Sequence, residues 1–246
     1  MKMSVLKKGI LGMLLPAVLL CGESAMAAIS LDRTRVVFPG NEKSVSLSIA
    51  NVSSQKPYLA QAWLEDAKGN KVNSPLVVTP PLQRLEPLKK SVVRVSVTDA
   101  ISGLPTDRES LFYFSLREIP PRSEQPNVMQ LALQSKIKLF YRPAAIIPEK
   151  YSRLDNLLVL HPAANGYKVE NPSPYYMTIL GITGSSKSNI PKGFKAVMIE
   201  PKSSKFIQSE VYGEPYLTTI DDFGGKPVLG FPCRNGVCRA ALSDGQ

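Results

Sequence analysis

Histidine and cysteine are both scarce in this chain, which contains one histidine and three cysteines among 246 residues. The histidine, His161, precedes a proline, and no serine or cysteine can be assigned to it as the nucleophile of a hydrolytic triad. Gly224-Gly225 is not followed by the Lys-Ser pair of a phosphate-binding loop. The adjacent carboxylates Glu65-Asp66 and Asp221-Asp222 would point apart on a strand and are typical of solvated turns. We therefore expect a protein that is not an enzyme and that needs no metal or cofactor.

Apolar runs long enough to cross a bilayer are also lacking, because the longest candidate lies in the first 27 residues and is too short. This segment has the parts of a secretory signal peptide: lysines at positions 2, 7 and 8, an apolar core from Ile10 to Leu20, and the cleavage site Ala25-Met26-Ala27. We expect residues 1–27 to be removed before Ala28. The product would be an exported, soluble chain of about 219 residues with no stable membrane insertion.

Acidic residues are fewer than basic ones, and the formal net charge is +10. Removal of the signal peptide takes away three lysines and one glutamate and would leave +8. Outside the cytoplasm this excess is no argument for binding of nucleic acid. It favours solubility, or attraction to an acidic partner or chain terminus.

Two cysteines remain in the exported chain, within the sequence Cys233-Arg-Asn-Gly-Val-Cys238. In an oxidising compartment this spacing predicts a disulfide across a hairpin whose turn is Asn-Gly. A metal site is not expected, because no further cysteine and only one histidine are present.

No segment has a long helical period, whereas short alternating segments recur along the chain. In the first half they include Val45 to Ile49, Tyr58 to Leu64, Val93 to Val97 and Leu111 to Leu116, separated by Gly, Pro and Asn turns. In the second half they are Leu157 to Leu160, Tyr167 to Glu170, Tyr175 to Ile182, Phe194 to Glu200 and Val228 to Phe231. Short strands at this spacing predict β-sandwiches, here two, joined by a stiff linker at Ala144 to Lys150.

The stretch from Asn127 to Arg142 alternates for longer than one strand normally does. Its odd positions are apolar except Ser135, and a strand of this length would extend for roughly 50 Å, although strands usually have about 5–6 residues. We expect one long strand, partly packed in the core of this protein and partly left for another molecule. Two shorter strands that meet at a bend near Ser135 are the alternative.

Three segments carry a resemblance to a known family: Ser30 to Phe38, Leu104 to Pro121, and Lys136 to Pro143. They resemble the periplasmic pilus chaperones, the fimbrial assembly chaperones, with one departure, because the family generally has Asn where this chain has Ser115. The resemblance covers the whole exported chain. It implies an all-β fold of two immunoglobulin-like β-sandwich domains in an L or boomerang, which we expect at residues 28–146 and 147–246.

The resemblance also implies a function in fimbrium biogenesis. Family members act in the periplasm without ATP and without a cofactor; they bind, fold and cap pilus subunits and the adhesin by donor-strand complementation, and deliver them to an outer-membrane usher. Free family members can self-associate. Carried over by position, the donor side chains would be Met129, Leu131 and Leu133, the anchor of the subunit's C-terminal carboxylate would be Arg35 and Lys138, and the charged trio between the domains would be Glu109, Arg142 and Asp222.

Each of these residue groups also has a simpler interpretation. Without the resemblance, the apolar three could be ordinary core, and the charged residues could be solvated surface groups. The competing function is a secreted two-domain immunoglobulin-like binding module, which would recognise a folded partner through loops at one end of a sandwich.

Overall fold

The computed structural model describes residues 27–124, 126–150 and 152–241. The expected signal peptide, apart from Ala27, therefore lies outside the described residues. Within them no helix is long and apolar enough to cross a membrane.

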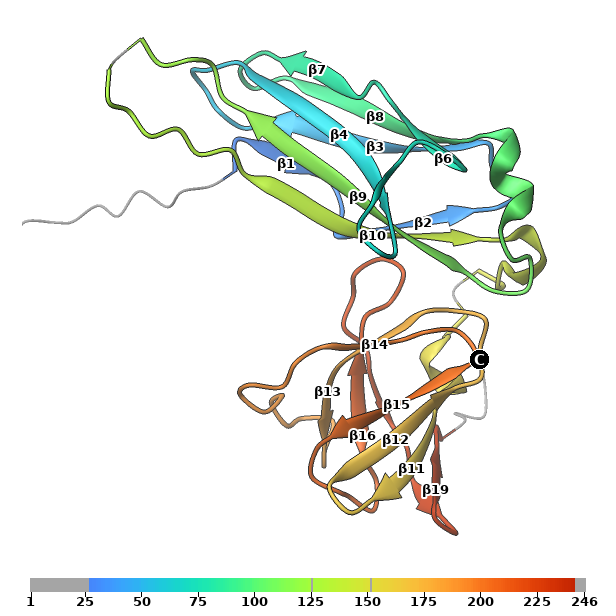
Figure 1. Ribbon diagram of the computed structural model, residues 1–246. Coiled ribbons are helices and arrows are strands. Elements are labelled where there is room, and N and C mark those ends of the chain that lie inside the picture. Colours follow the sequence, from blue (N-terminus) through green and yellow to red (C-terminus); the bar gives the residue numbers. More distant parts are fainter. Residues whose placement is uncertain (1–26, 125, 151, 242–246) are drawn as a thin grey trace, which may run out of the picture.

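Two β-sandwiches form the molecule, as predicted, and Figure 1 shows them set at an angle to one another. The strands of the first are β1 (Ile29–Leu31), β2 (Arg35–Pro39), β3 (Ser44–Asn51), β4 (Tyr58–Asp66), β5 (Lys71–Val72), β6 (Leu76–Thr79), β7 (Leu82–Leu85), β8 (Lys90–Val97), β9 (Ser110–Ile119) and β10 (Gln134–Arg142). One sheet has the order β1-β3-β8-β6, and the other has β2-β10-β9-β4-β5 with β7 beside β4. A short 3-10 helix, η1 (Asp99–Gly103), connects β8 to β9.

Alternation in sequence becomes alternation in burial in this domain. Leu47 and Ile49 of β3 are buried while Ser48 between them is exposed, and Val93 and Val95 of β8 flank the exposed Arg94. Because successive side chains of a strand point to opposite faces, each sheet places one apolar face in the core and one polar face in water. Phe38, Phe114 and other fully buried side chains fill the space between the sheets.

The chain passes from one sheet of the sandwich to the other between β1 and β2. β1 pairs antiparallel with β3, and after a turn at residues 32–34 the chain continues as β2, which pairs in parallel with β10. The parallel pairing places Arg35 directly beside Lys138. This change of sheet brings a residue from the start of the domain next to its last strand.

The predicted long strand is only partly correct. β10 begins at Gln134, and residues 128–133 before it form no strand, so the expectation of one strand from Asn127 is wrong, as is the alternative of two strands. Leu133 still accepts one hydrogen bond through its carbonyl oxygen from the Glu118 backbone N–H, at 3.0 Å. The part that does pair is held by β9 on one side, from Gln134 onward, and by β2 on the other, from Lys138 onward.

The second sandwich follows two further 3-10 helices, η2 (Ala144–Ile146), within the expected linker, and η3 (Asp155–Leu157). Its strands are β11 (Val159–Ala163), β12 (Gly166–Asn171), β13 (Met177–Thr183), β14 (Val197–Ile199), β15 (Ser203–Gln208), β16 (Tyr216–Thr219), β17 (Val228–Gly230), β18 (Cys233–Arg234) and β19 (Val237–Arg239). They form the sheets β15-β12-β11-β19-β18 and β14-β13-β16-β17 around a core that includes Tyr167 and Phe231.

The predicted disulfide is confirmed. Cys233 and Cys238 are bonded and lie opposite each other on β18 and β19. The turn between them places Asn235 and Gly236 at positive φ (51° and 78°), which Asn and Gly tolerate better than other residues.

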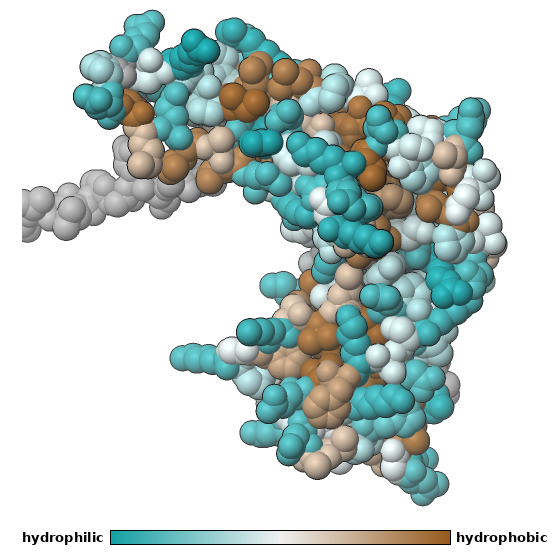
Figure 2. All heavy atoms as spheres, in the orientation of Figure 1, coloured by the Kyte–Doolittle hydropathy of each residue, from teal (hydrophilic) through white to brown (hydrophobic). Residues whose placement is uncertain are grey.

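Figure 2 shows that the molecule is concave on one side, where the two domains face each other across a broad hollow. The loop between β16 and β17 projects from the second domain toward β10 of the first (Figure 1). On the same side the connection between β9 and β10, drawn in yellow-green, extends beyond the end of the first sandwich (Figure 1).

Candidate functional site

β10 presents four large side chains in a row on the outer face of its sheet: Lys136, Lys138, Phe140 and Arg142. The intervening residues Leu139 and Tyr141 point into the core. These four side chains have different neighbours, which are described below. Together they extend along one strand face from the exposed end of the first domain to the boundary with the second.

Arg35 and Lys138 form a cationic pair at the boundary between the domains, where Arg35 contacts Ile220 of the second domain. Their Cα atoms are partners in the parallel ladder, and both side chains are half-buried. Burial lowers the pKa of Lys138, and the positive charge of Arg35 lowers it further. Burial also lowers the pKa of Arg35, while Asp222 and Asp221 partly oppose that shift.

These two cations have unused hydrogen-bonding capacity. The Arg35 Nη1 group donates a long hydrogen bond of 3.5 Å to the carbonyl oxygen of Ile220, and its Nε is buried without a partner. Among the described residues neither Arg35 nor Lys138 forms an ion pair. Two adjacent, partly desolvated cations with free donors are suited to bind an anionic oxygen pair such as a carboxylate.

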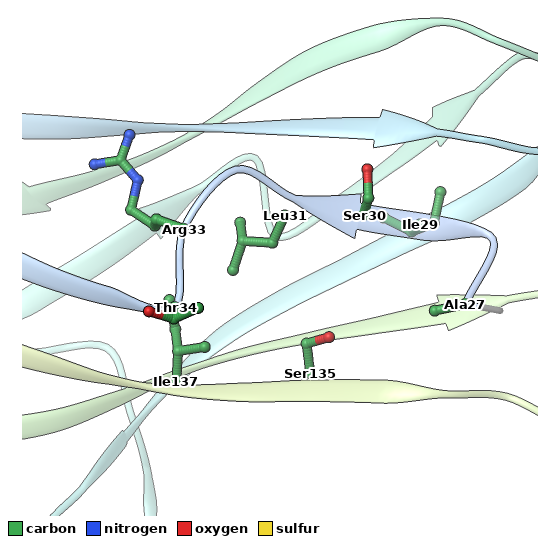
Figure 3. Close-up of a pocket in the computed structure, with 8 residues that line it drawn as sticks. All are labelled: Ala27, Ile29, Ser30, Leu31, Arg33, Thr34, Ser135 and Ile137. Carbon is green, nitrogen blue, oxygen red and sulfur yellow. The ribbon is translucent and has the colours of Figure 1, made fainter. Parts of the chain in front are cut away.

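An open strand edge lies next to this pair. β2 covers the edge of β10 only from Lys138 onward, so Gln134 to Ile137 have no strand beside them on that side in the described structure. A cavity of about 380 Å³ lies beside this open edge, between β1 and β10. It is lined mainly by apolar or small side chains. Figure 3 shows β1 on one side of this cavity and β10 on the other, with Leu31 pointing into it.

Met129, Leu131 and Leu133 lie in the segment that leads into β10, and they are 85%, 67% and 41% exposed. They continue the odd-numbered series of Ile137, Leu139 and Tyr141, but beyond the point where the opposing sheet covers it. Large apolar side chains in an alternating, solvent-exposed segment are a liability for aggregation unless a partner covers them.

Glu109, Arg142 and Asp222 lie together between the domains. The Arg142 guanidinium donates to Glu109 Oε1 at 2.8 Å and to both carboxylate oxygens of Asp222 at 2.7 and 3.0 Å. Burial raises the pKa of Glu109 against the pull of Arg142. For Arg142, burial lowers the pKa, but the hydrogen bonds and charges of Asp222 and Glu109 outweigh it, so the guanidinium stays charged.

Two aromatic side chains that the sequence analysis did not single out complete this boundary. The Tyr176 ring stacks on Phe140 at 5.4 Å between centroids, and its backbone N–H donates to Glu109 Oε2 at 2.7 Å. Arg142 lies over the Tyr175 ring. The only signal in the sequence was a pair of tyrosines at the start of the strand expected from Tyr175 to Ile182, and β13 begins only after them, at Met177.

The prediction that Glu65 lies in a solvated turn is wrong. It lies on β4, is buried, and accepts hydrogen bonds from the indole N–H of Trp63 (2.8 Å), the Ser115 hydroxyl (3.0 Å) and the Lys136 ammonium. Asp66 beside it does cap the exposed turn before β5. The Lys136 hydrogen bond is the largest cause that lowers the pKa of Glu65, ahead of those from Trp63 and Ser115.

Comparison with known proteins gives a consistent result over both domains. The family model described as the N-terminal domain of the pili and flagellar-assembly chaperone PapD matches residues 28–147, and the model of the PapD C-terminal domain matches residues 154–229. The chain is 52% identical to the chaperone protein PapD of Escherichia coli, over 95% of this chain and 98% of the relative. It is 44% identical to the chaperone protein PmfD of Proteus mirabilis, over 91% and 90% of the two chains.

Solved structures agree with this assignment. The periplasmic chaperone SfaE is 30% identical, with a TM-score of 0.65 over 83% of this chain and all of that one. The SafB chaperone in complex with SafA pilin, from Salmonella enterica, matches with 27% identity and a TM-score of 0.72, over 86% and 99%. The competing prediction, a secreted binding module of another kind, is not favoured by these matches. The chain belongs to the PapD family of pilus assembly chaperones.

Proposed function

We propose that this protein is a periplasmic chaperone that binds, folds and caps pilus subunits and the adhesin, without ATP, by lending them part of its own sheet. The observation that carries the proposal is the course of β10. Its inner face enters the core at Ile137, while Met129, Leu131 and Leu133 continue the same series in solvent. A subunit that lacks a strand would have an open apolar groove, and these three exposed side chains would fill it.

Binding starts, in this proposal, with the subunit's C-terminal carboxylate on Arg35 and Lys138. Charge-assisted hydrogen bonds to such a group contribute about 1.5–3 kcal/mol each. The subunit's last strand then pairs with the open edge of β10 from Ile137 toward Gln134, beside the cavity that Leu31 lines. Because side chains alternate along a strand, this anchor also sets which apolar residue meets which part of the groove.

Release occurs by strand exchange at an outer-membrane usher. Glu109, Arg142 and Asp222 hold the two domains, at residues 28–146 and 147–246, at the angle that keeps the hollow open. The pilin bound to the SafB chaperone supports a pilus subunit as the partner class. A periplasmic location agrees with the similarity to the periplasmic chaperone SfaE and with the signal peptide expected at residues 1–27.

Co-expression with a pilus subunit tests the function. The wild-type chaperone should allow recovery of the subunit from the periplasm, and Arg35→Ala should abolish it although the variant folds. Arg94→Ala removes an exposed cation from β8 in the other sheet and serves as the matched control, with normal recovery expected. Equal recovery with Arg35→Ala and Arg94→Ala would contradict the proposal.

A further inference from the structure

Phe223 is 87% exposed, the most exposed of the large apolar side chains in the described structure. It lies in the loop between β16 and β17, which projects from the second domain toward β10 of the first (Figure 1). Neither the disulfide, the charged trio nor the core makes use of its ring.

The loop that carries Phe223 is held firmly from within. The side-chain oxygen Oδ1 of Asp221 accepts the backbone N–H groups of Phe223 (2.9 Å) and Gly225 (2.7 Å), and the backbone N–H of Asp221 donates to the Gly225 carbonyl oxygen at 3.1 Å. These hydrogen bonds fix the backbone of the tip, and the Phe223 side chain on it is exposed.

The same loop is also attached to the first domain at three points. Asp222 binds Arg142, the Ile220 carbonyl oxygen accepts from Arg35, and Gly224 lies so close to Thr34 that a Cβ would come within 2.7 Å of its hydroxyl oxygen. Gly224 also has φ +87°, which favours glycine. These attachments hold the loop that carries Phe223 against the start of β2, next to Arg35.

We propose that Phe223 is the contact for the apolar side chain next to the partner's anchored C-terminus. The inference rests on the proposed function and extends it. Arg35 and Lys138 would bind only the terminal carboxylate, whereas Phe223 would contact the side chain of the partner's last residue. The partner segment is therefore an extended chain that ends in an apolar or aromatic residue. An aromatic terminal residue fits best, because offset ring pairs add to the free energy of apolar burial.

Binding of two short synthetic peptides tests this inference. Both alternate valine and threonine and have a free carboxylate; one ends in Phe and the other in Ala. The wild type should bind the Phe-ended peptide about tenfold more tightly, as one aromatic contact of about 1.4 kcal/mol predicts. In Phe223→Ala this preference should disappear, while Phe223→Leu should keep part of it.

The matched control is Phe206→Ala, which removes a half-exposed phenylalanine from β15 in the other sheet of the same domain and should keep the full preference. Thermal unfolding at the wild-type temperature confirms that each variant folds. A wild-type protein without the preference, or Phe223→Ala with it, overturns the inference alone if amidation still weakens binding. If neither peptide binds, or if amidation has no effect, the proposed function fails and the inference with it.

Discussion

At the scale of single residues, Glu65 connects three strands through its side chain. Glu65 lies on β4, Ser115 on β9 and Lys136 on β10. The ion pair therefore fixes the beginning of β10 to the sheet, just after the exposed segment. Glu65 is buried, whereas Lys136 is partly exposed. Loss of the charge would leave the ammonium without its partner and weaken the start of β10.

Glu65→Gln should lower the free energy of unfolding at pH 7 by about 1–3 kcal/mol, the usual effect of breaking a buried charged hydrogen bond. The pKa of Glu65 is lowered in the folded state, so this stabilisation is present above its ordinary value of 4.5 and is lost as the pH falls through the folded pKa. The difference between wild type and Glu65→Gln, measured by urea unfolding, should therefore shrink below pH 4.5.

Glu86→Gln is the control for that experiment, because Glu86 forms an ion pair with Arg84 in which both side chains are more than half exposed. Exposed pairs contribute little, so its effect should be close to zero at every pH. A constant difference for Glu65→Gln across the pH range would show that the carboxylate's charge is not what stabilises β10.

The disulfide between Cys233 and Cys238 closes a short loop, which limits what it can contribute. Replacing both cysteines by serine should lower the unfolding free energy of the second domain by about 2 kcal/mol, from the loop-entropy estimate. Calorimetry measures this loss. Subunit recovery should be unchanged, since no residue of the hairpin lies in the cationic pair, the open edge or the exposed segment, and a folded variant without binding would contradict that placement.

At the scale of elements, β10 shows what alternation in sequence predicts and what it does not. The pattern from Met129 to Tyr141 indicates which side chains share a face, and the buried residues Leu139 and Tyr141 agree with it. A strand, however, also needs a backbone partner. β9 pairs with β10 only as far as Gln134, and β2 reaches only Lys138, so the pattern continues where the ladder ends.

Contacts between residues far apart in the chain could be predicted from the sequence only through the family resemblance. Nothing local indicates that Arg35 lies beside Lys138, or that Glu109 and Asp222 meet Arg142, because those pairs depend on the sheet change after β1 and on a loop of the other domain. Glu65 was misplaced for a related reason. Adjacent carboxylates are usually solvated, and the three donors that satisfy Glu65 come mostly from distant strands.

Leu131→Asp tests the exposed segment. Because Leu131 is 67% exposed, the charge should not unfold the chaperone, but it should abolish recovery of a co-expressed pilus subunit. Three large apolar side chains in a groove contribute together roughly 5–9 kcal/mol before other costs, and a carboxylate there would lose much of this. Subunit yield in the periplasm measures the effect.

Ala132→Asp is the matched control, because Ala132 is an exposed neighbour at an even position and would point away from the groove. It should leave subunit yield nearly unchanged. Loss of recovery with both variants would indicate a general sensitivity of the segment to charge, and normal recovery with Leu131→Asp would exclude this residue from the contact.

At the scale of the whole molecule, we propose that Arg142 fixes the angle between the domains through its contacts with Glu109 and Asp222. The side chains of Arg142 and Glu109 are 6% and 1% exposed. Arg142→Met leaves a buried carboxylate uncompensated and should cost about 3–5 kcal/mol of unfolding free energy. Small-angle scattering should show a broader range of domain angles, together with reduced subunit recovery.

Asp107→Asn is the control for this variant, because Asp107 pairs across the domain boundary with Lys202, but on the surface, where the side chains are 50% and 42% exposed. It should leave both the scattering profile and the stability nearly unchanged. An unaltered profile for Arg142→Met would mean that Phe140 and Tyr176, rather than the charged trio, set the angle.

Anchoring of a chain terminus by Arg35 and Lys138 is the central claim, and peptide binding tests it most directly. A peptide that copies the C-terminal strand of a pilus subunit should bind the wild type about tenfold or more tightly with a free carboxylate than when amidated, because each charged hydrogen bond contributes about 1.5–3 kcal/mol. Lys138→Ala should remove most of that difference while it leaves the protein folded. Equal binding of the free and amidated peptides to the wild type would contradict the account.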